Sequence, residues 1–514
     1  MVEKTSLSKT QYFMQNFYWM FINLLVATVF PLFVRSLMIR EWGIEYAGIS
    51  GLFTSVLQVL SISELGMGSA ILYSMYKPMA ENDISTVNAL LNLYRKIYRN
   101  LGIGIFIAGM ALLPFIQFLI YGEYPADINI YIIYIIQLLN TVIGYAVGYY
   151  WAVILQADQK VGTDYKIGAI TAGVMYILQL FVVCNSHNYY LYIILFPLST
   201  LMLNSARAFY IQHKYPHIHC EGAVGHSYMK DFSRRVFAMA LSKVRTAIRS
   251  SIDSIVISAY MGLAALAQYQ NYYQIMLVPV LLVGIVKGAV LPEFGVSVAT
   301  DSQENNYHFF EIYSFANNWF STWCTVCLLC LGQNFMSLWV GEQNVLSDSV
   351  IILMCIYFYM KSISDNATMI REATGVWWIG KEGAVIESIL NLTLDILFVR
   401  YWGIQGVLTA TILALVCINL PFEYLSIFKG YFQIGVGQYF LKQIIYLING
   451  ILICGVTYTI CSKFPLGNFK VLLLEAGICI LLPNILYIML NFYRKEFGQV
   501  LHILCDSIEK RKQK

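Results

Sequence analysis

Four charged residues interrupt the apolar stretch Ala240–Ala259: Lys243, Arg245, Arg249 and Asp253. On a helix, the last three are spaced four residues apart and share one face. A charge at the centre of a bilayer costs at least about 2.5 kcal/mol, so such a face normally points toward protein or water. The stripe therefore predicts positive charge held inside a membrane.

Three further charged residues lie within apolar segments, namely Arg35, Glu64 and Lys287. In this set the basic residues outnumber the acids, and arginine offers two parallel donors to a phosphate. We therefore expect a cationic cavity that binds an anionic group. Two alternatives stay open. The charges could form a structural ion-pair network that includes Arg249 with Asp253, or Arg35 and Lys243 could reach for the membrane interface.

Amides and tyrosines form a second candidate group. Gln270 and Gln274 share a helical face near three tyrosines, and Gln137 and Asn140 lie in an earlier apolar segment. Such side chains suit sugar hydroxyls, although polar residues in spans commonly hydrogen-bond between helices. The substrate-binding candidates are thus Arg35, Arg245, Arg249, Lys287, Gln270 and Gln274. The candidates for ion coupling or ion pairing are Glu64 and Asp253.

Composition indicates an all-α integral membrane protein. The 514 residues are 58% hydrophobic and 12% charged, whereas soluble domains are about 25% charged. With about 20 apolar residues per span, the chain predicts about 14 transmembrane helices. Weak matches at a nearly constant offset, such as Lys166-Ile-Gly-Ala-Ile with Lys381-Glu-Gly-Ala-Val, indicate an internal repeat. The expected domains are a lobe at 1–230, a parallel six-helix lobe at 231–430, and two helices with a basic tail at 431–514, around a central cavity.

Lysine and arginine gather on one side of these spans, which places both termini in the cytoplasm. Lys361 is counted among these cytoplasmic residues. The connection Met75–Arg99 is expected to lie on the membrane surface, and the tail from Phe492 to form an interfacial helix. Two external boundaries, Arg40-Glu-Trp-Gly-Ile and Arg400-Tyr-Trp-Gly-Ile, predict tight turns at glycine.

No cofactor or metal is expected. His213, His217, His219 and Cys220 lie in a hydrophilic linker, which favours a solvated loop over a metal site. Cys324, Cys327 and Cys330 recur every three residues on an apolar helix, which favours packing over an iron–sulfur cluster. Neither a Walker motif nor a dinucleotide fingerprint is found in the sequence, so nothing predicts an ATP-driven machine.

Three blocks resemble a known family. They begin at Arg35-Ser-Leu-Met-Ile-Arg-Glu-Trp-Gly, Leu60-Ser-Ile-Ser-Glu-Leu-Gly-Met-Gly and Tyr76-Lys-Pro-Met-Ala-Glu-Asn. They are similar to the N-terminal signature of bacterial oligosaccharide flippases, which transport O-antigen and capsule repeat units and belong to the multidrug/oligosaccharidyl-lipid/polysaccharide (MOP) superfamily. Gly403-Ile-Gln-Gly-Val-Leu-Thr-Ala-Thr is similar to a later block of the family.

The resemblance implies a flippase that carries an oligosaccharide on undecaprenyl diphosphate from the cytoplasmic to the external leaflet of the bacterial inner membrane. Arg35, Arg245 and Arg249 would hold the diphosphate, and protons or sodium ions could drive transport. The expected partners are the lipid-linked oligosaccharide, membrane lipids and other polysaccharide assembly proteins, with no nucleic acid, and the chain is expected to be a monomer. Two alternatives remain: a cation-coupled multidrug exporter of the same fold, and a polysaccharide polymerase or ligase, which the short external turns disfavour.

Overall fold

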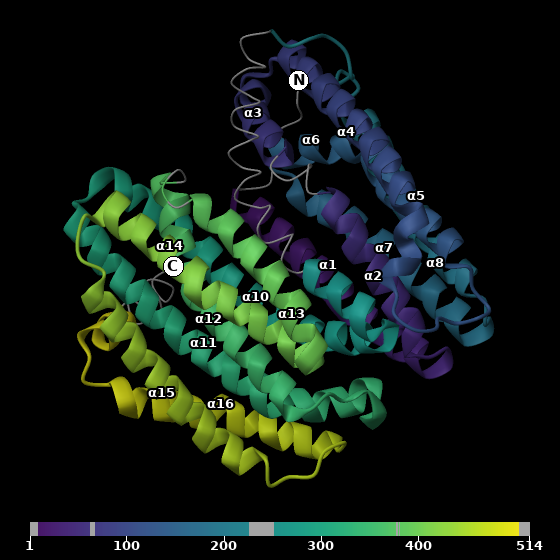
Figure 1. Ribbon diagram of the computed structural model, residues 1–514. Helices are drawn as coiled ribbons and strands as arrows, with labels where there is room; N and C mark the ends of the chain where they lie inside the picture. Colours follow the sequence, from purple (N-terminus) through teal and green to yellow (C-terminus); the bar gives the residue numbers. More distant parts are fainter. Residues whose placement is uncertain (1–8, 62–66, 226–250, 377–378, 380, 503–514) are drawn as a thin grey trace. The chain divides into compact units, whose positions relative to one another are not determined.

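The computed structural model describes residues 9–502 except 62–66, 226–250, 377–378 and 380. The chain divides into two compact units, Met1–Ala267 and Gln268–Lys514. In Figure 1 the first runs from purple through blue to teal, and the second from teal to yellow. The predicted lobe boundary between residues 230 and 231 lies outside the described residues.

All regular secondary structure in the described part of the first unit is helical. Its elements are α1 (Lys9–Glu41), α2 (Ile44–Leu60), α3 (Met67–Glu81), α4 (Ile84–Leu112), η2 (Leu113–Leu119), α5 (Ile130–Ala146), η3 (Tyr149–Trp151), α6 (Ala152–Ala157), α7 (Val161–Asn185), α8 (Tyr189–Lys214) and the helical segment Ser251–Met261. Helices α1 and α7 pack along each other (Figure 1).

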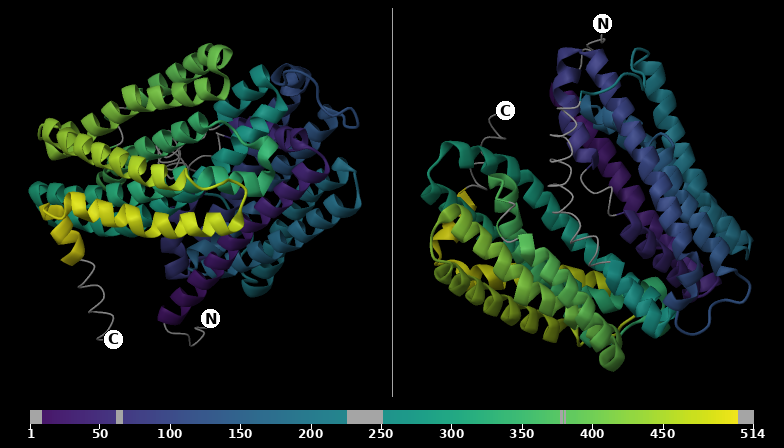
Figure 2. Two further views of the ribbon diagram at one scale, coloured as in Figure 1. Left: turned by 90° about the horizontal axis from the view of Figure 1, so that it is seen from below. Right: turned by 45° about the horizontal axis from the view of Figure 1, so that its top comes forward.

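The second unit is also helical, and α10 enters it from the first. Its elements are α10 (Leu263–Thr300), α11 (Gln303–Val340), η4 (Glu342–Asn344), α12 (Asp348–Thr374), α13 (Lys381–Ala414), the π-helix η5 (Leu415–Asn419), α14 (Leu420–Ile427), the π-helix η6 (Phe428–Phe432), α15 (Gly437–Cys461) and α16 (Phe469–Asn491). Figure 2 shows α15 and α16, the last and yellowest helices, side by side.

Among the described residues, eleven helical stretches are long and apolar enough to cross a membrane. The most apolar windows of α11 and α12 are each 67% buried inside the protein, against 22% for α16 and 6% for α1. Helices α11 and α12 therefore form the interior of the second unit, whereas the outer helices keep apolar surface for lipid.

Short polar residues start several of these helices. Asn129, Asn188 and Asn468 each accept a hydrogen bond from the backbone N–H two residues further on, at 2.9–3.0 Å. Each side chain satisfies a donor that the first helical turn leaves without a partner. These caps explain why α5, α8 and α16 begin where they do.

Both predicted glycine turns are present. Gly43 separates α1 from α2 with φ 111°, and Gly403 interrupts α13 with φ 58° and ψ −133°. These backbone conformations are strained for any residue with a Cβ atom. The stretch Glu382–Phe432 is therefore bent at Gly403, which separates the two spans that the sequence predicts there.

Two local predictions are corrected. Residues 84–99 are not a separate surface helix but the first half of α4, and Tyr94 and Tyr98 are buried in the core of the first unit. In the tail, Phe497 and Val500 do not face lipid. They are buried against protein, in a cluster that includes Phe315 of α11.

Candidate functional site

Arg35 lies six residues before the end of α1, in aromatic surroundings. Its Nη2 donates to the backbone carbonyl of Ala267 at 3.3 Å. Nearby, Trp42 packs edge-on against Tyr189 and Tyr192, which stack on each other with ring centroids 5.8 Å apart. Arg35 thus links the end of α1 to the start of α10 inside the first unit.

The charged stripe is only partly described. Asp253 is buried in the first unit with 3% of its surface exposed, and the neighbouring Ser251 donates to Gln58 Oε1 of α2 at 3.1 Å. Arg245, Arg249 and Glu64 lie outside the described residues, as does Lys243. Their proposed roles stay predictions.

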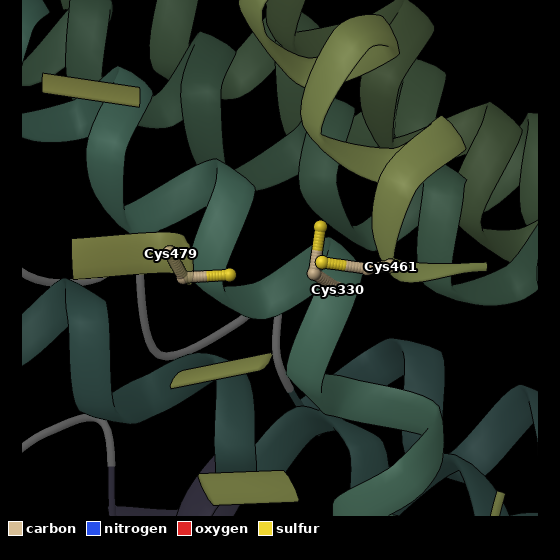
Figure 3. Close-up of side chains that lie close together, drawn as sticks. All are labelled: Cys330, Cys461 and Cys479. Carbon is tan, nitrogen blue, oxygen red and sulfur yellow. The ribbon is translucent and has the colours of Figure 1, made fainter. Parts of the chain in front are cut away.

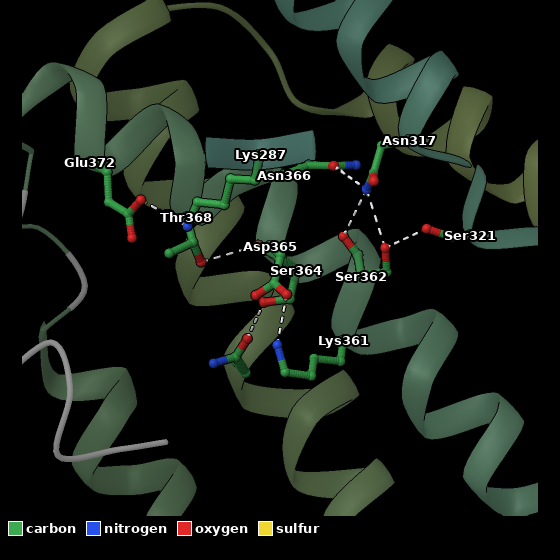
Figure 4. Close-up of polar contacts among 11 residues, drawn as sticks. Lys287, Asn317, Ser321, Lys361, Ser362, Ser364, Asp365, Asn366, Thr368 and Glu372 are labelled. Atoms are coloured by element: carbon green, nitrogen blue, oxygen red, sulfur yellow. Dashed lines mark hydrogen bonds and ion pairs between the residues drawn. The ribbon is translucent and has the colours of Figure 1, made fainter. Parts of the chain in front are cut away.

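Lys287 is in an ion pair within the second unit. Its Nζ lies 2.8 Å from Glu372 Oε2, which joins α10 to α12. A second pair, Lys361 Nζ with Asp365 Oδ2 at 2.7 Å, lies one helical turn along α12 itself. All four side chains keep between 18% and 31% of their surface exposed. Figure 4 shows both pairs along α12.

Lys361 lies at a different position along its helix from the one that the sequence predicts. It lies 13 residues from each end of α12, or about 20 Å along the axis. Lys361 is therefore a mid-helix residue of a helix long enough to span a membrane, whereas the sequence places it among the charges at the cytoplasmic boundary. Intramembrane charges of this kind face protein or a water-filled cavity and are candidates for function.

The predicted amide group is mostly structural where its contacts are described. Asn140 of α5 accepts from Thr200 of α8 at 2.7 Å, and Tyr272 of α10 donates to Gln333 of α11. Gln270 and Gln274 lie half-buried, one turn apart on α10. Hydrogen bonding between helices therefore accounts for Asn140. It also accounts for Tyr272, which lies beside the two glutamines in the sequence.

A polar network that the sequence did not indicate joins α11 to α12. Asn317 Nδ2 lies 2.7 Å from Asn366 Oδ1 and 3.2 Å from Ser362 Oγ, and Ser321 and Ser362 also hydrogen-bond (Figure 4). Asn366 in turn donates to Ser314. These side chains are buried, so the network fixes the two inner helices against each other.

The bent helix α13 holds a compact set of oxygen and amide groups. Asn391 Nδ2 lies 3.0 Å from Asp395 Oδ2 and 3.3 Å from Thr411 Oγ1, which lies beyond the bend at Gly403. Thr411 also donates to the carbonyl of Val407 at 3.1 Å. Asp395 has 0% of its surface exposed. Asn391 donates its amide N–H groups to both oxygens, so the carboxylate of Asp395 and the hydroxyl of Thr411 are the oxygen ligands present here. Such ligands suit hard cations, and Na⁺ would bind in place of the donated N–H groups.

A second buried acid lies two turns earlier on the same helix. Glu387 accepts from Asn419 Nδ2 at 2.8 Å, and Asn419 accepts from Ser364 of α12. Asn419 ends the π-helix η5, and such irregular turns are frequent at functional sites. The link places Glu387 in a hydrogen-bonded chain rather than in a group of ion ligands.

The second unit contains buried acids that are not among the residues singled out from the sequence. The described spans of the second unit bury Glu387, Asp395, Glu423 and Glu475, and Arg371 pairs with Glu423 at 2.7 Å. The predicted set of basic residues lies mainly in the first unit and outside the described residues, so its excess of positive charge stays a prediction. Glu64 and Asp253 are the acids singled out from the sequence, and extending that search to the later apolar runs would have found these residues.

No protein-family model matches the chain. No curated protein sequence matches it either. Solved structures do match. The lipid II flippase MurJ, in an inward closed conformation, has a TM-score of 0.68 at 17% identity and covers 95% of this chain and 99% of its own.

Multidrug transporters of the MATE family also match. An inward-facing MATE transporter of the MOP superfamily has a TM-score of 0.65 at 13% identity and covers 80% of this chain and 98% of its own. A MOP superfamily transporter from Pyrococcus furiosus, with a binding pocket of reversed polarity, has a TM-score of 0.57 at 13% identity and covers 83% of this chain and 97% of its own. At these identities the likeness establishes the fold, and the predicted all-α, many-span membrane architecture is confirmed.

Proposed function

We propose that the chain is a flippase for an oligosaccharide linked to undecaprenyl diphosphate. The observation that carries the proposal is the extent of the structural match. The lipid II flippase covers 95% of the chain, whereas the multidrug transporter reported above covers 80%. The N-terminal block that resembles oligosaccharide flippases favours a sugar-bearing lipid as the substrate. Alternating access between two lobes would move it from the cytoplasmic to the external leaflet.

Basic side chains would hold the diphosphate. Arg35, Arg245 and Arg249 keep this proposed role, and Lys287 and Lys361 are held by carboxylates of α12. An ion pair that is partly exposed to a water-filled cavity would exchange its carboxylate for a phosphate at smaller cost than a fully buried pair. The two lysines would thus be paired at rest and available when the substrate arrives.

A cation bound near Asp395 would couple the cycle to an ion gradient. Asn391, Asp395 and Thr411 come from both sides of the bend at Gly403, so a bound cation would hold the two arms of α13 together. Discontinuous helices of this kind are common ion sites in secondary transporters. We propose Na⁺ or H⁺ as the coupling ion, and a monomer in the bacterial inner membrane with both termini cytoplasmic as the working form.

The test is a gene deletion in the native host, complemented with variants. Deletion should trap assembled lipid-linked oligosaccharide on the cytoplasmic leaflet and abolish the surface glycan. Arg245→Ala and Arg249→Ala should fail to restore export although the protein inserts at normal levels. Lys77→Met, at an 82% exposed side chain, should restore it. Normal export by both arginine variants would refute the diphosphate site.

A cation-coupled multidrug exporter is the second candidate. The buried carboxylates of the second unit favour it, because acids in the interior suit cationic drugs. In that case deletion would increase sensitivity to cationic compounds and leave the surface glycan unchanged. Measuring the surface glycan and drug sensitivity in the same deletion strain therefore distinguishes a flippase from a drug exporter.

A further inference from the structure

Three cysteines from three different helices meet inside the second unit. Cys330 comes from α11, Cys461 from the last residue of α15, and Cys479 from α16. Their sulfur atoms all lie within 4.8 Å of one another, and each residue is at least 93% buried. Figure 3 shows the side chains converging from separate ribbons, with the sulfur of Cys479 directed toward the other two.

The spacing suits a metal ion. Zinc–sulfur bonds are about 2.3 Å long, so three thiolates around one ion in a plane lie about 4.0 Å apart. The three sulfur atoms need to close by less than about 1 Å to reach this geometry. Sulfur ligands select soft ions such as Cu(I) and Zn(II) over hard ones. We propose that Cys330, Cys461 and Cys479 form a binding site for a thiophilic metal ion that fastens α15 and α16 to α11.

A small cavity with polar and apolar walls borders two of the three cysteines. It has a volume of about 160 Å³, and its walls include Cys330, Cys461, Asp348 and Glu475. The two carboxylates attract a cation, and they can accept the protons that thiols release when a metal binds. The cavity thus supplies the entry path that the buried sulfur atoms would otherwise lack.

Charge neutrality fits the apolar surroundings. The bound complex carries no net charge when the number of deprotonated thiols equals the charge of the ion, and the remaining thiols coordinate as neutral ligands. Cu(I) then requires one released proton and Zn(II) two. An uncharged complex avoids the large cost of a buried charge.

The site joins α11 to the consecutive helices α15 and α16, which lie far from it in sequence, so a bound metal would cross-link distant parts of the second unit. Helices α15 and α16 follow the bent α13–α14 region, and each packs on α11. A metal that binds only the folded arrangement stabilises it in proportion to its affinity and concentration. Loading should therefore raise the resistance of the second unit to unfolding. The inference is independent of the transported substrate.

The experiment uses the purified full-length protein in detergent, reduced without thiol reagents and freed of metal. It is titrated with Cd(II), whose thiolate complexes absorb in the ultraviolet, and then with Zn(II) and Cu(I) against chelators of known affinity. The wild type should bind one equivalent. Cys330→Ser and Cys461→Ser should weaken binding at least tenfold. Cys355→Ser, a 4% exposed cysteine of α12 outside the cluster, should bind like the wild type.

The relative affinities for Cu(I) and Zn(II) identify which ion the site prefers, and tight binding of either supports the proposal. Equal titrations of the wild type and the two cluster variants would overturn it. So would loss of two free thiols on mild oxidation in a protein that binds no metal, since that result indicates a disulfide. Gel filtration and the helical content measured by circular dichroism test whether each variant is folded. If Cys330→Ser is not folded, Cys330→Ala replaces it.

Discussion

The pair of Arg371 and Glu423 allows a quantitative test of the second unit. Arg371 of α12 is 8% exposed and Glu423 of α14 is 1% exposed, with Nη1 and Oε1 2.7 Å apart. Arg371 also donates to the backbone carbonyls of Val376 and Ile379 at 3.3 and 3.4 Å. Glu423→Leu leaves the guanidinium buried without its carboxylate, which costs about 3–5 kcal/mol.

Removing both charges should cost less. Replacing a buried ion pair with apolar residues is neutral or stabilising by about 1–4 kcal/mol. Here the arginine's two carbonyl partners would lose their donors, at about 1–3 kcal/mol for an unsatisfied group. We therefore expect the double variant Arg371→Met with Glu423→Leu to lie within about 2 kcal/mol of the wild type.

The free energy of unfolding in mixed micelles, titrated with a denaturing detergent, measures both effects. The exposed pair of Lys77 and Glu81, 3.8 Å apart, is the matched control, and Lys77→Met should leave the unfolding curve unchanged. If Glu423→Leu and the double variant were equally unstable, the two charges would not be coupled, and the buried ion pair would have no energetic role.

Three further predictions concern α12 and α13. Asp395→Asn should weaken the dependence of transport on cation concentration at least tenfold, whereas Glu387→Gln should keep it; both are measured as uptake against Na⁺ or pH in proteoliposomes. Equal effects would contradict the assignment of the cation to Asp395. Lys361→Met should lower transport at least tenfold because it leaves Asp365 without the partner 2.7 Å away, and wild-type transport by this variant would remove Lys361 from the substrate path. Gly403→Ala should destabilise the protein by about 1–3 kcal/mol, because alanine strains at φ 58°; an unchanged unfolding curve would show that the bend relaxes.

The sequence predicts best what depends on neighbouring residues. Gly43 and Gly403 follow tryptophans at the ends of apolar runs, and both have the positive φ that the turns require. The all-α, many-span architecture is predicted correctly for the same reason, since hydropathy is a local property; the described residues contain eleven long apolar helical stretches, against about 14 expected spans. Predictions fail where a helix continues past its apolar part. Helix α4 begins at its Asp83 cap, 16 residues before Arg99, because the amphipathic half packs Tyr94 and Tyr98 into the core.

Pairing across helices could not be predicted. Lys287 and Glu372 lie in spans that are not consecutive, and no periodicity in either relates the two. The charges counted from the sequence include the acids Glu64 and Asp253 but omit others such as Asp395, which lie within long apolar runs where a hydropathy average hides them. A single buried acid in such a run is costly, and it is therefore a stronger signal than its effect on the average suggests.

The cysteines show why this limit matters for function. Read along α11, Cys324, Cys327 and Cys330 form a run at three-residue spacing, and packing explains such a run without any ligand. Read across the fold, Cys330 belongs with Cys461 and Cys479. The sequence alone thus identifies Cys330 as a packing residue, whereas the tertiary structure identifies it as a candidate metal ligand. In membrane proteins, where apolar runs hide small polar groups, sites are defined by which helices touch, and only the tertiary structure supplies that information.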